Sequence, residues 1–198
     1  MLADGMHDVP RGKLATVVTH LEMTSHVQTT PRALPEGVTF RRVQPDVAWY
    51  RDVYKRVGGL DWLWFGRLTV DDDALGAILT DPGTEFYTLS KDGQDHALLE
   101  LDFRTPGECE LMYFGLTASL IGTGCGRALM NEAVAHAWSK PITRFHLRTC
   151  TFDSPQALRF YQRSGFTIVK HAIEIADDPR KLGLLPETAA PHVPLLRG

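Results

Sequence analysis

The stretch GTGCG at residues 122–126 constrains the fold of this chain more than any other feature. Residues 109–116 before it have strand character. Residues 127–138 after it have helical spacing, with one apolar face made of Leu129, Met130, Ala133, Val134 and Ala137. Glycine tolerates positive φ, and the free N–H groups and dipole at a helix start attract anions. The stretch therefore predicts a phosphate-binding turn, with Arg127 adding a charge-assisted contact.

The spacing of these glycines excludes two common nucleotide motifs. In a GxGxxG dinucleotide fingerprint, the third glycine would fall at Arg127 or Leu129. A P-loop fails too, because no glycine followed by Lys-Ser or Lys-Thr stands at the required spacing. A tight turn in which the glycines only relieve strain is the structural alternative.

The rest of the chain predicts a mixed order of strands and helices. Strands are expected at residues 38–44, 85–90, 96–103, 109–116, 143–151 and 167–175, and helices at 46–58, 70–79, 127–138 and 153–166. Asp46 caps the first helix and Gly58 ends it, whereas Asp153 or Ser154 caps the last helix and Gly165 ends it. This order predicts an α/β (α+β) sheet with helices on both faces.

The two ends of the chain differ from this central region. Residues 1–37 are expected to form an N-terminal arm, with a strand at 13–23 and a connector at 29–37. Residues 38–176 form the main domain, and 177–198 a proline-rich tail that wraps the surface.

Composition narrows the classes of function. The chain has 198 residues, 43% of them hydrophobic, and a formal net charge of -3. No dense basic cluster, bilayer-length apolar run or signal peptide is present, so we expect a cytoplasmic protein without a nucleic-acid or membrane partner. Three separated cysteines indicate a reducing compartment, and the eight scattered histidines predict no metal site.

Two motifs resemble those of the GNAT superfamily of acetyl-CoA-dependent N-acetyltransferases, over residues 38–175. The superfamily's Arg/Gln-x-x-Gly-x-Gly/Ala loop falls on Ile121, Gly124 and Gly126. Its Asn-x-x-Ala-x-x-x-Tyr helix falls on Ser154, Ala157 and Tyr161. Ile121 and Ser154 depart from the pattern, so backbone N–H groups and Arg127 would have to hold the pyrophosphate.

The resemblance implies a mostly antiparallel sheet that is splayed at its centre, where acetyl-CoA binds as co-substrate. Tyr161 would donate a proton to the departing sulfur; a core tyrosine is the structural alternative. The expected cofactor-binding residues are Phe114, Gly115, Leu116, Ile121, Gly122, Thr123, Gly124, Cys125, Gly126, Arg127 and Ser154.

Two carboxylates are candidates for the base that deprotonates the amine. Glu100 and Glu110 both interrupt apolar strands, where burial would raise a carboxylate pKa. Glu110 is preferred, because Met112 and Phe114 are expected on its side of the strand. Solvent exposure or pairing with an arginine is the structural alternative for both. The expected acceptor pocket consists of Trp62, Trp64, Phe65 and Tyr113, which could equally be core residues.

The leading hypothesis is an N-acetyltransferase that acetylates a primary amine by direct transfer in a ternary complex. A non-catalytic acyl-CoA-binding or sensing module and a structural protein are the alternatives. The acceptor is a small-molecule or peptide amine; antibiotic, polyamine, amino acid, protein N-terminus and lysine all remain open. A homodimer through the arm or the last strands is a further hypothesis.

Overall fold

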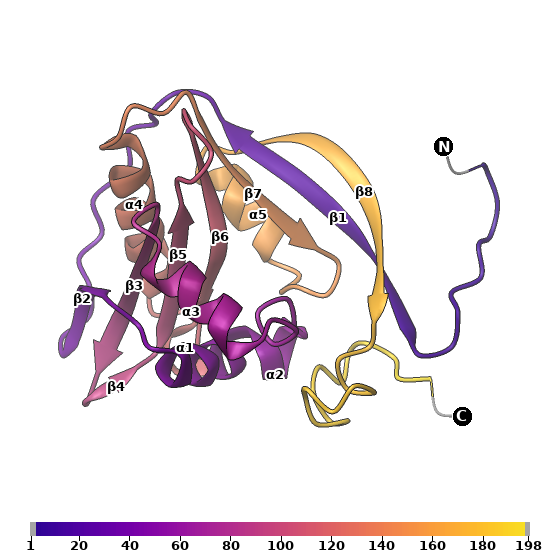
Figure 1. Cartoon of the computed structure of the whole chain (residues 1–198). Helices are drawn as coiled ribbons and strands as arrows, with labels where there is room; N and C mark the ends of the chain where they lie inside the picture. Colours follow the sequence, from indigo (N-terminus) through magenta and orange to yellow (C-terminus); the bar gives the residue numbers. More distant parts are fainter. Residues whose placement is uncertain (1–2, 197–198) are drawn as a thin grey trace.

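The structure, a computed structural model, describes residues 3–196 and is built around one eight-stranded sheet (Figure 1). The strand order is β2-β3-β5-β6-β7-β1-β8, with β4 paired to β3. The strands are β1 (Lys13–Met23), β2 (Val38–Val43), β3 (Thr84–Lys91), β4 (Gln94–Asp95), β5 (Ala97–Asp102), β6 (Glu108–Leu116), β7 (Arg144–Cys150) and β8 (Thr167–Asp177). Within residues 3–196, only β6 and β7 pair in parallel, which confirms the expected mixed, mostly antiparallel sheet.

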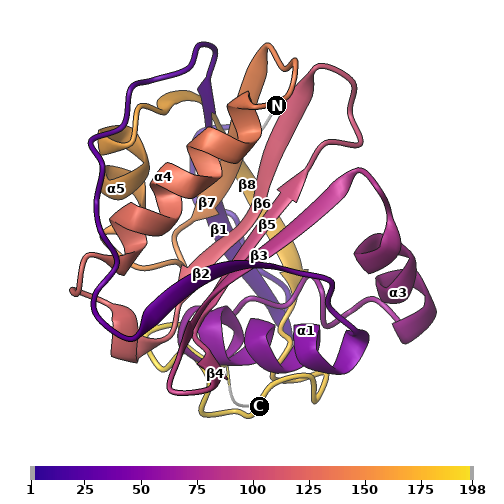
Figure 2. The same ribbon diagram turned by 90° about the vertical axis from the view of Figure 1, so that its left-hand side faces the viewer.

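The N-terminal strand β1 lies inside this sheet. It pairs antiparallel with β7 on one side and with β8 on the other. The strand expected at 13–23 is confirmed, but it is an internal strand of the main sheet and not part of a separate arm. Residues 24–37 then pass outside α5 and α4 to reach β2 (Figure 2). The first two residues of the expected arm lie outside the described part of the chain.

Helices cover both faces of the sheet, as expected. Helices α4 (Cys125–Trp138) and α5 (Ala157–Arg163) pack on one face. Helices α1 (Val47–Tyr54), α2 (Leu60–Trp62) and α3 (Asp72–Thr80) lie on the other. The capping role of Asp46 is confirmed, because its carboxylate accepts a 2.7 Å hydrogen bond from the Trp49 N–H.

Gly58 does not end the first helix, contrary to expectation. The helix continues from α1 through a π-helical turn, Lys55–Gly59, into α2, and the left-handed residue follows at Leu63 (φ 58°). A Cβ atom at Gly58 would overlap the indole of Trp64. The glycine therefore allows a close contact and does not act as a C-cap.

The expected cap of α5 is also wrong. The helix begins at Ala157, after Gln156. The Asp153 carboxylate instead accepts hydrogen bonds from the Thr149 hydroxyl (2.7 Å) and the Cys150 N–H (2.9 Å). Asp153 therefore holds the turn after β7, while Gly165 (φ 102°) follows α5 as predicted.

The C-terminal segment is part of the core and not only a surface wrap. Leu185, Ala190 and Val193 are buried and belong to the same core cluster as residues of α1 and α3. Within the segment, Arg180 forms a buried ion pair with Asp178 at 2.8 Å. Residues 197 and 198 of the expected tail lie outside the described residues.

A buried ion pair joins the loop between α2 and α3 to β5. Glu100 is inaccessible to solvent and is ion-paired with Arg67, and it also accepts a hydrogen bond from the Tyr50 hydroxyl. Burial raises the pKa of Glu100, and the Arg67 guanidinium opposes this increase. The Nε of Arg67 has no hydrogen-bond partner among the described residues. The Glu100 carboxylate is therefore the group that compensates the buried charge of the guanidinium.

We predict that Arg67→Met lowers the free energy of unfolding by about 3–5 kcal/mol near neutral pH, because Glu100 is left buried without its counter-ion. Without Arg67, folded Glu100 retains its proton above the pH at which unfolded Glu100 ionises. The folded state then binds more protons, so stability decreases as pH rises through this interval. Urea unfolding at several pH values measures this slope, and a pH-independent loss of stability contradicts the prediction. The control Arg67→Met/Glu100→Gln removes the titrating group and should flatten the slope.

Candidate active site

The site begins where the pairing of β6 with β7 ends. The two strands pair from Glu108–Arg144 to Leu111–Leu147 and then separate. Beyond this point β6 extends to Leu116 and pairs only with β5. The splay expected at the centre of the sheet is therefore present, and the β6 edge at residues 112–116 faces a cavity of about 710 Å³.

A β-bulge in β6 coincides with the splay. Leu111 lies opposite Leu101, but Tyr113 lies opposite Glu100, so Met112 is the extra residue. The bulge reverses the alternation of side chains. Phe114 and Leu116 pack against the core that contains Leu111. The expectation that Phe114 shares a face with Glu110 is therefore wrong.

The glycine loop forms one end of the cavity. Gly122 (φ 80°) and Gly124 (φ 93°) have left-handed conformations, and α4 begins at Cys125. A Cβ at Gly122 would meet no atom within 4 Å, so the backbone there is open to approach. Side chains of Thr123 and Cys125 turn away: the Thr123 hydroxyl donates to the Leu120 carbonyl (2.7 Å), and Cys125 is fully buried.

Ile121 and Arg127 were both expected to bind the cofactor, but the Ile121 side chain is apolar and that of Arg127 already donates a hydrogen bond within the protein. Ile121 is 56% exposed and provides no polar group. Arg127 lines the cavity, but its guanidinium donates to the Ser164 hydroxyl at 3.0 Å and lies 5.1 Å from the Phe160 ring centroid. A second arginine, Arg32, lies directly over the loop and was not anticipated from the sequence.

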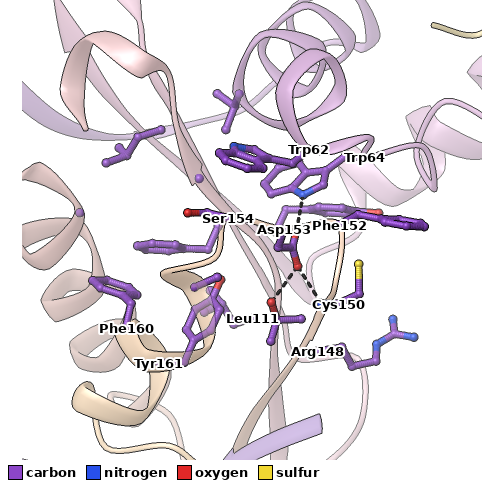
Figure 3. Close-up of a pocket in the computed structure, with 18 of the residues that line it drawn as sticks. Trp62, Trp64, Leu111, Arg148, Cys150, Phe152, Asp153, Ser154, Phe160 and Tyr161 are labelled. Carbon is purple, nitrogen blue, oxygen red and sulfur yellow. Dashed lines mark hydrogen bonds between the residues drawn. The ribbon is translucent and has the colours of Figure 1, made fainter. Parts of the chain in front are cut away.

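Tyr161 lies on α5 beside Phe160 and lines the cavity (Figure 3). Its ring contacts Phe114 and Phe166, each with a centroid separation of 6.3 Å. Burial raises the pKa of the Tyr161 phenol, and the Asp153 charge adds to this increase. A tyrosine carries its proton at neutral pH even with an ordinary pKa, so the Tyr161 phenol is protonated there.

The far wall of the cavity is aromatic. All four predicted acceptor residues line the cavity: Trp62, Trp64, Phe65 and Tyr113. The Trp64 and Tyr113 rings also pack against Tyr54, at centroid distances of 5.6 and 4.9 Å. These rings line the cavity and contact the buried core, so the two interpretations of the aromatic cluster are not exclusive.

Trp64 joins this wall to the sheet. Its indole lies between two glycines, because a Cβ at Gly58 would overlap the ring and one at Gly115 would lie 2.9 Å from it. Its Nε1–H donates to the Asp153 carboxylate at 3.0 Å (Figure 3). Gly115, predicted as a cofactor-binding residue, is therefore also required for this packing.

The two candidate bases occupy different positions. Glu100 is enclosed by Arg67 and Tyr50 and does not line the cavity, so it cannot contact a substrate there directly. Glu110 lines the cavity, with its side chain 22% exposed and its carboxylate 3.2 Å from the Arg148 Nε.

Several residues line the cavity that the sequence patterns did not identify as site residues. Tyr54, Arg148 and Phe152 reach the cavity from α1, from β7 and from the following turn. Tyr54 has the periodicity of a core residue, and Phe152 lies in a turn, so neither carries a local signal of function. Among residues 3–196, no cluster of His, Cys, Asp and Glu forms a metal site, and no helix is long and apolar enough to cross a membrane.

Comparisons with known proteins agree with this geometry. The chain is 25% identical over 169 residues to an uncharacterized N-acetyltransferase of Lactobacillus delbrueckii subsp. lactis, covering 80% of this chain and 93% of that one. A GCN5-related N-acetyltransferase from Sphaerobacter thermophilus shares the fold (TM-score 0.63, 14% identity, 82% of this chain and 52% of that one). This chain thus spans about half the length of that structure.

A GNAT family acetyltransferase from Elizabethkingia anophelis, solved with acetyl-CoA bound, also shares the fold. Its TM-score is 0.53 at 15% identity, over 69% of this chain and 80% of that one. The acetyltransferase (GNAT) family model matches residues 44–166, which is more than half of the sequence. The chain belongs to the GNAT family of acetyltransferases.

Proposed function

We propose that this protein transfers an acetyl group from acetyl-CoA to a primary amine, by direct transfer while both substrates are bound. The observation that carries the proposal is one continuous cavity. It runs from the glycine loop along the unpaired edge of β6 to the aromatic wall, and Tyr161 lies between these ends.

The shape of the cavity suits coenzyme A. The open backbone at Gly122 and the start of α4 can bind its diphosphate through N–H groups. The edge of β6 at residues 112–116 has no strand partner on the cavity side, so its backbone can pair with the amide groups of an extended pantetheine.

The transfer requires two proton movements. The thioester of bound acetyl-CoA supplies the acetyl group; the amine nitrogen gains this group and loses a proton, and the sulfur leaves and gains one. We assign the second proton to Tyr161, because this residue lines the cavity and its phenol carries a proton at neutral pH. A backbone N–H of β6 near Gly115 stabilises the charge that develops on the carbonyl oxygen.

Glu110 is the better candidate to accept the proton from the amine, because it lines the cavity and Glu100 does not. The aromatic wall, which includes Trp62 and Phe65, suits an amine attached to an apolar or aromatic group. Both small-molecule and peptide amines have this chemistry.

Two measurements test the function. Titration calorimetry with acetyl-CoA should show binding, and thiol release should follow when a panel of primary amines is added. Absence of acetyl-CoA binding overturns the proposal. Binding without thiol release for any amine supports a non-catalytic acyl-CoA-binding module instead, the alternative that the Ile121 and Ser154 departures keep open.

Tyr161→Phe should lower kcat by about a hundredfold, since it removes the proton donor and retains the ring. Coenzyme A affinity should remain unchanged. Steady-state kinetics and calorimetry measure the two quantities. Tyr87→Phe is the matched control, because its hydroxyl contacts Glu85 and His136 away from the cavity. Full turnover by Tyr161→Phe would exclude the proton-donor role.

Glu110→Gln should remove the acidic limb of the pH profile of kcat/KM, because the group that must be ionised is gone. Glu108→Gln is the control: it lies on the same strand and also pairs with an arginine, Arg144, but does not line this cavity. An acidic limb that persists in Glu110→Gln would rule this carboxylate out as the base.

A further inference from the structure

We infer that Arg32 binds the diphosphate of coenzyme A and supplies the side-chain contact that Ile121 cannot make. The inference rests on the proposed function. It adds a cofactor-binding residue from the segment between β1 and β2, far from the glycine loop in the sequence.

The geometry places the Arg32 guanidinium against the loop. Its Nε and Nη2 atoms each lie 2.8 Å from the position that a Cβ on Gly124 would occupy. Arg32 also lines the cavity together with Gly122 and Arg127. Any side chain at Gly124 would displace this arginine, so the glycine allows both the turn and the contact.

Contacts with the protein body hold the segment that carries Arg32. The Asn131 side-chain amide of α4 donates to the Thr30 carbonyl at 2.8 Å, two residues before Arg32. Val27 and Leu34, on either side, pack against the core beneath α4. Figure 2 shows this segment passing outside α4 on its way to β2.

The charge distribution points to an anion at this position. Arg32 lies at the start of α4, a helix of 14 residues whose N-terminus carries partial positive charge. Arg127 adds a second cation to the same end of the cavity. Within residues 3–196, Arg32 forms no ion pair with a carboxylate. A bound anion would neutralise two guanidinium groups and a helix terminus together.

A diphosphate fits this arrangement better than a carboxylate. Its oxygens can accept hydrogen bonds from the N–H groups of the loop and from a guanidinium on the opposite side. Coenzyme A also carries a 3′-phosphate, so the experiment must separate the two phosphate groups.

The test compares Arg32→Ala, Arg32→Lys and the wild-type protein with three probes: coenzyme A, dephospho-coenzyme A and S-acetylpantetheine. Arg32→Ala should weaken binding of the first two by about tenfold, the typical effect of one charged hydrogen bond. Turnover with S-acetylpantetheine, which lacks the diphosphate, should not change. Arg32→Lys should recover part of the affinity. Arg11→Ala, at an exposed arginine outside the cavity, is the control for net charge.

Three results would overturn the inference. The first is an unchanged affinity of Arg32→Ala for coenzyme A. The second is a loss of affinity for coenzyme A but not for dephospho-coenzyme A, which identifies the 3′-phosphate as the partner. The third is an equal loss of turnover with S-acetylpantetheine, which indicates a structural role. Failure of the wild-type protein to bind coenzyme A would instead overturn the proposed function, so the two failures are distinguishable.

Discussion

The early end of pairing between β6 and β7 determines the form of the site. Both strands continue past Leu111 and Leu147, yet they share no hydrogen bonds beyond this pair. Burying a backbone N–H or C=O group without a hydrogen-bond partner costs free energy. The groups on the cavity side of β6 therefore require water or a ligand as their partner. The bulge at Met112 lies at the same point and directs Tyr113 to one face and Phe114 to the other. The end of strand pairing therefore exposes the β6 edge to the cavity, and the bulge at the same point places Tyr113 and Phe114 on opposite faces of the sheet.

Trp64 packs between the helical segment, β6 and the turn after β7. Its indole contacts Gly58 on the helix and Gly115 on β6, and it donates a hydrogen bond to Asp153 after β7. Beneath it, the Tyr113 ring lies 5.2 Å away and 5.4 Å from the buried Arg67 guanidinium. Glu100 is thus linked to the aromatic wall through Arg67, although it does not line the cavity itself.

Local patterns in the sequence were sufficient to predict most of the elements. β-Branched residues identified β1, alternation identified β2 and β7, helical spacing identified α4, and the strand-glycine-helix order identified the loop. Features that depend on distant residues were not predictable in this way. The place of β1 between β7 and β8, the overlap of Gly58 with Trp64 and the approach of Arg32 to Gly124 all arise from tertiary packing. The bulge at Met112 was missed because a single inserted residue leaves no periodic signal.

The internal position of β1 has a consequence for how the chain reaches this structure. Thr16 on β1 bonds to Thr151, 135 positions later, and Thr19 bonds to His171, 152 positions later. A ribosome releases the first strand long before either of its neighbours exists. Such distant pairings slow folding, and an unpaired strand invites aggregation in the interval. Nascent chains should therefore acquire the outer half of the sheet, and with it the cavity, only after β7 and β8 have been synthesised.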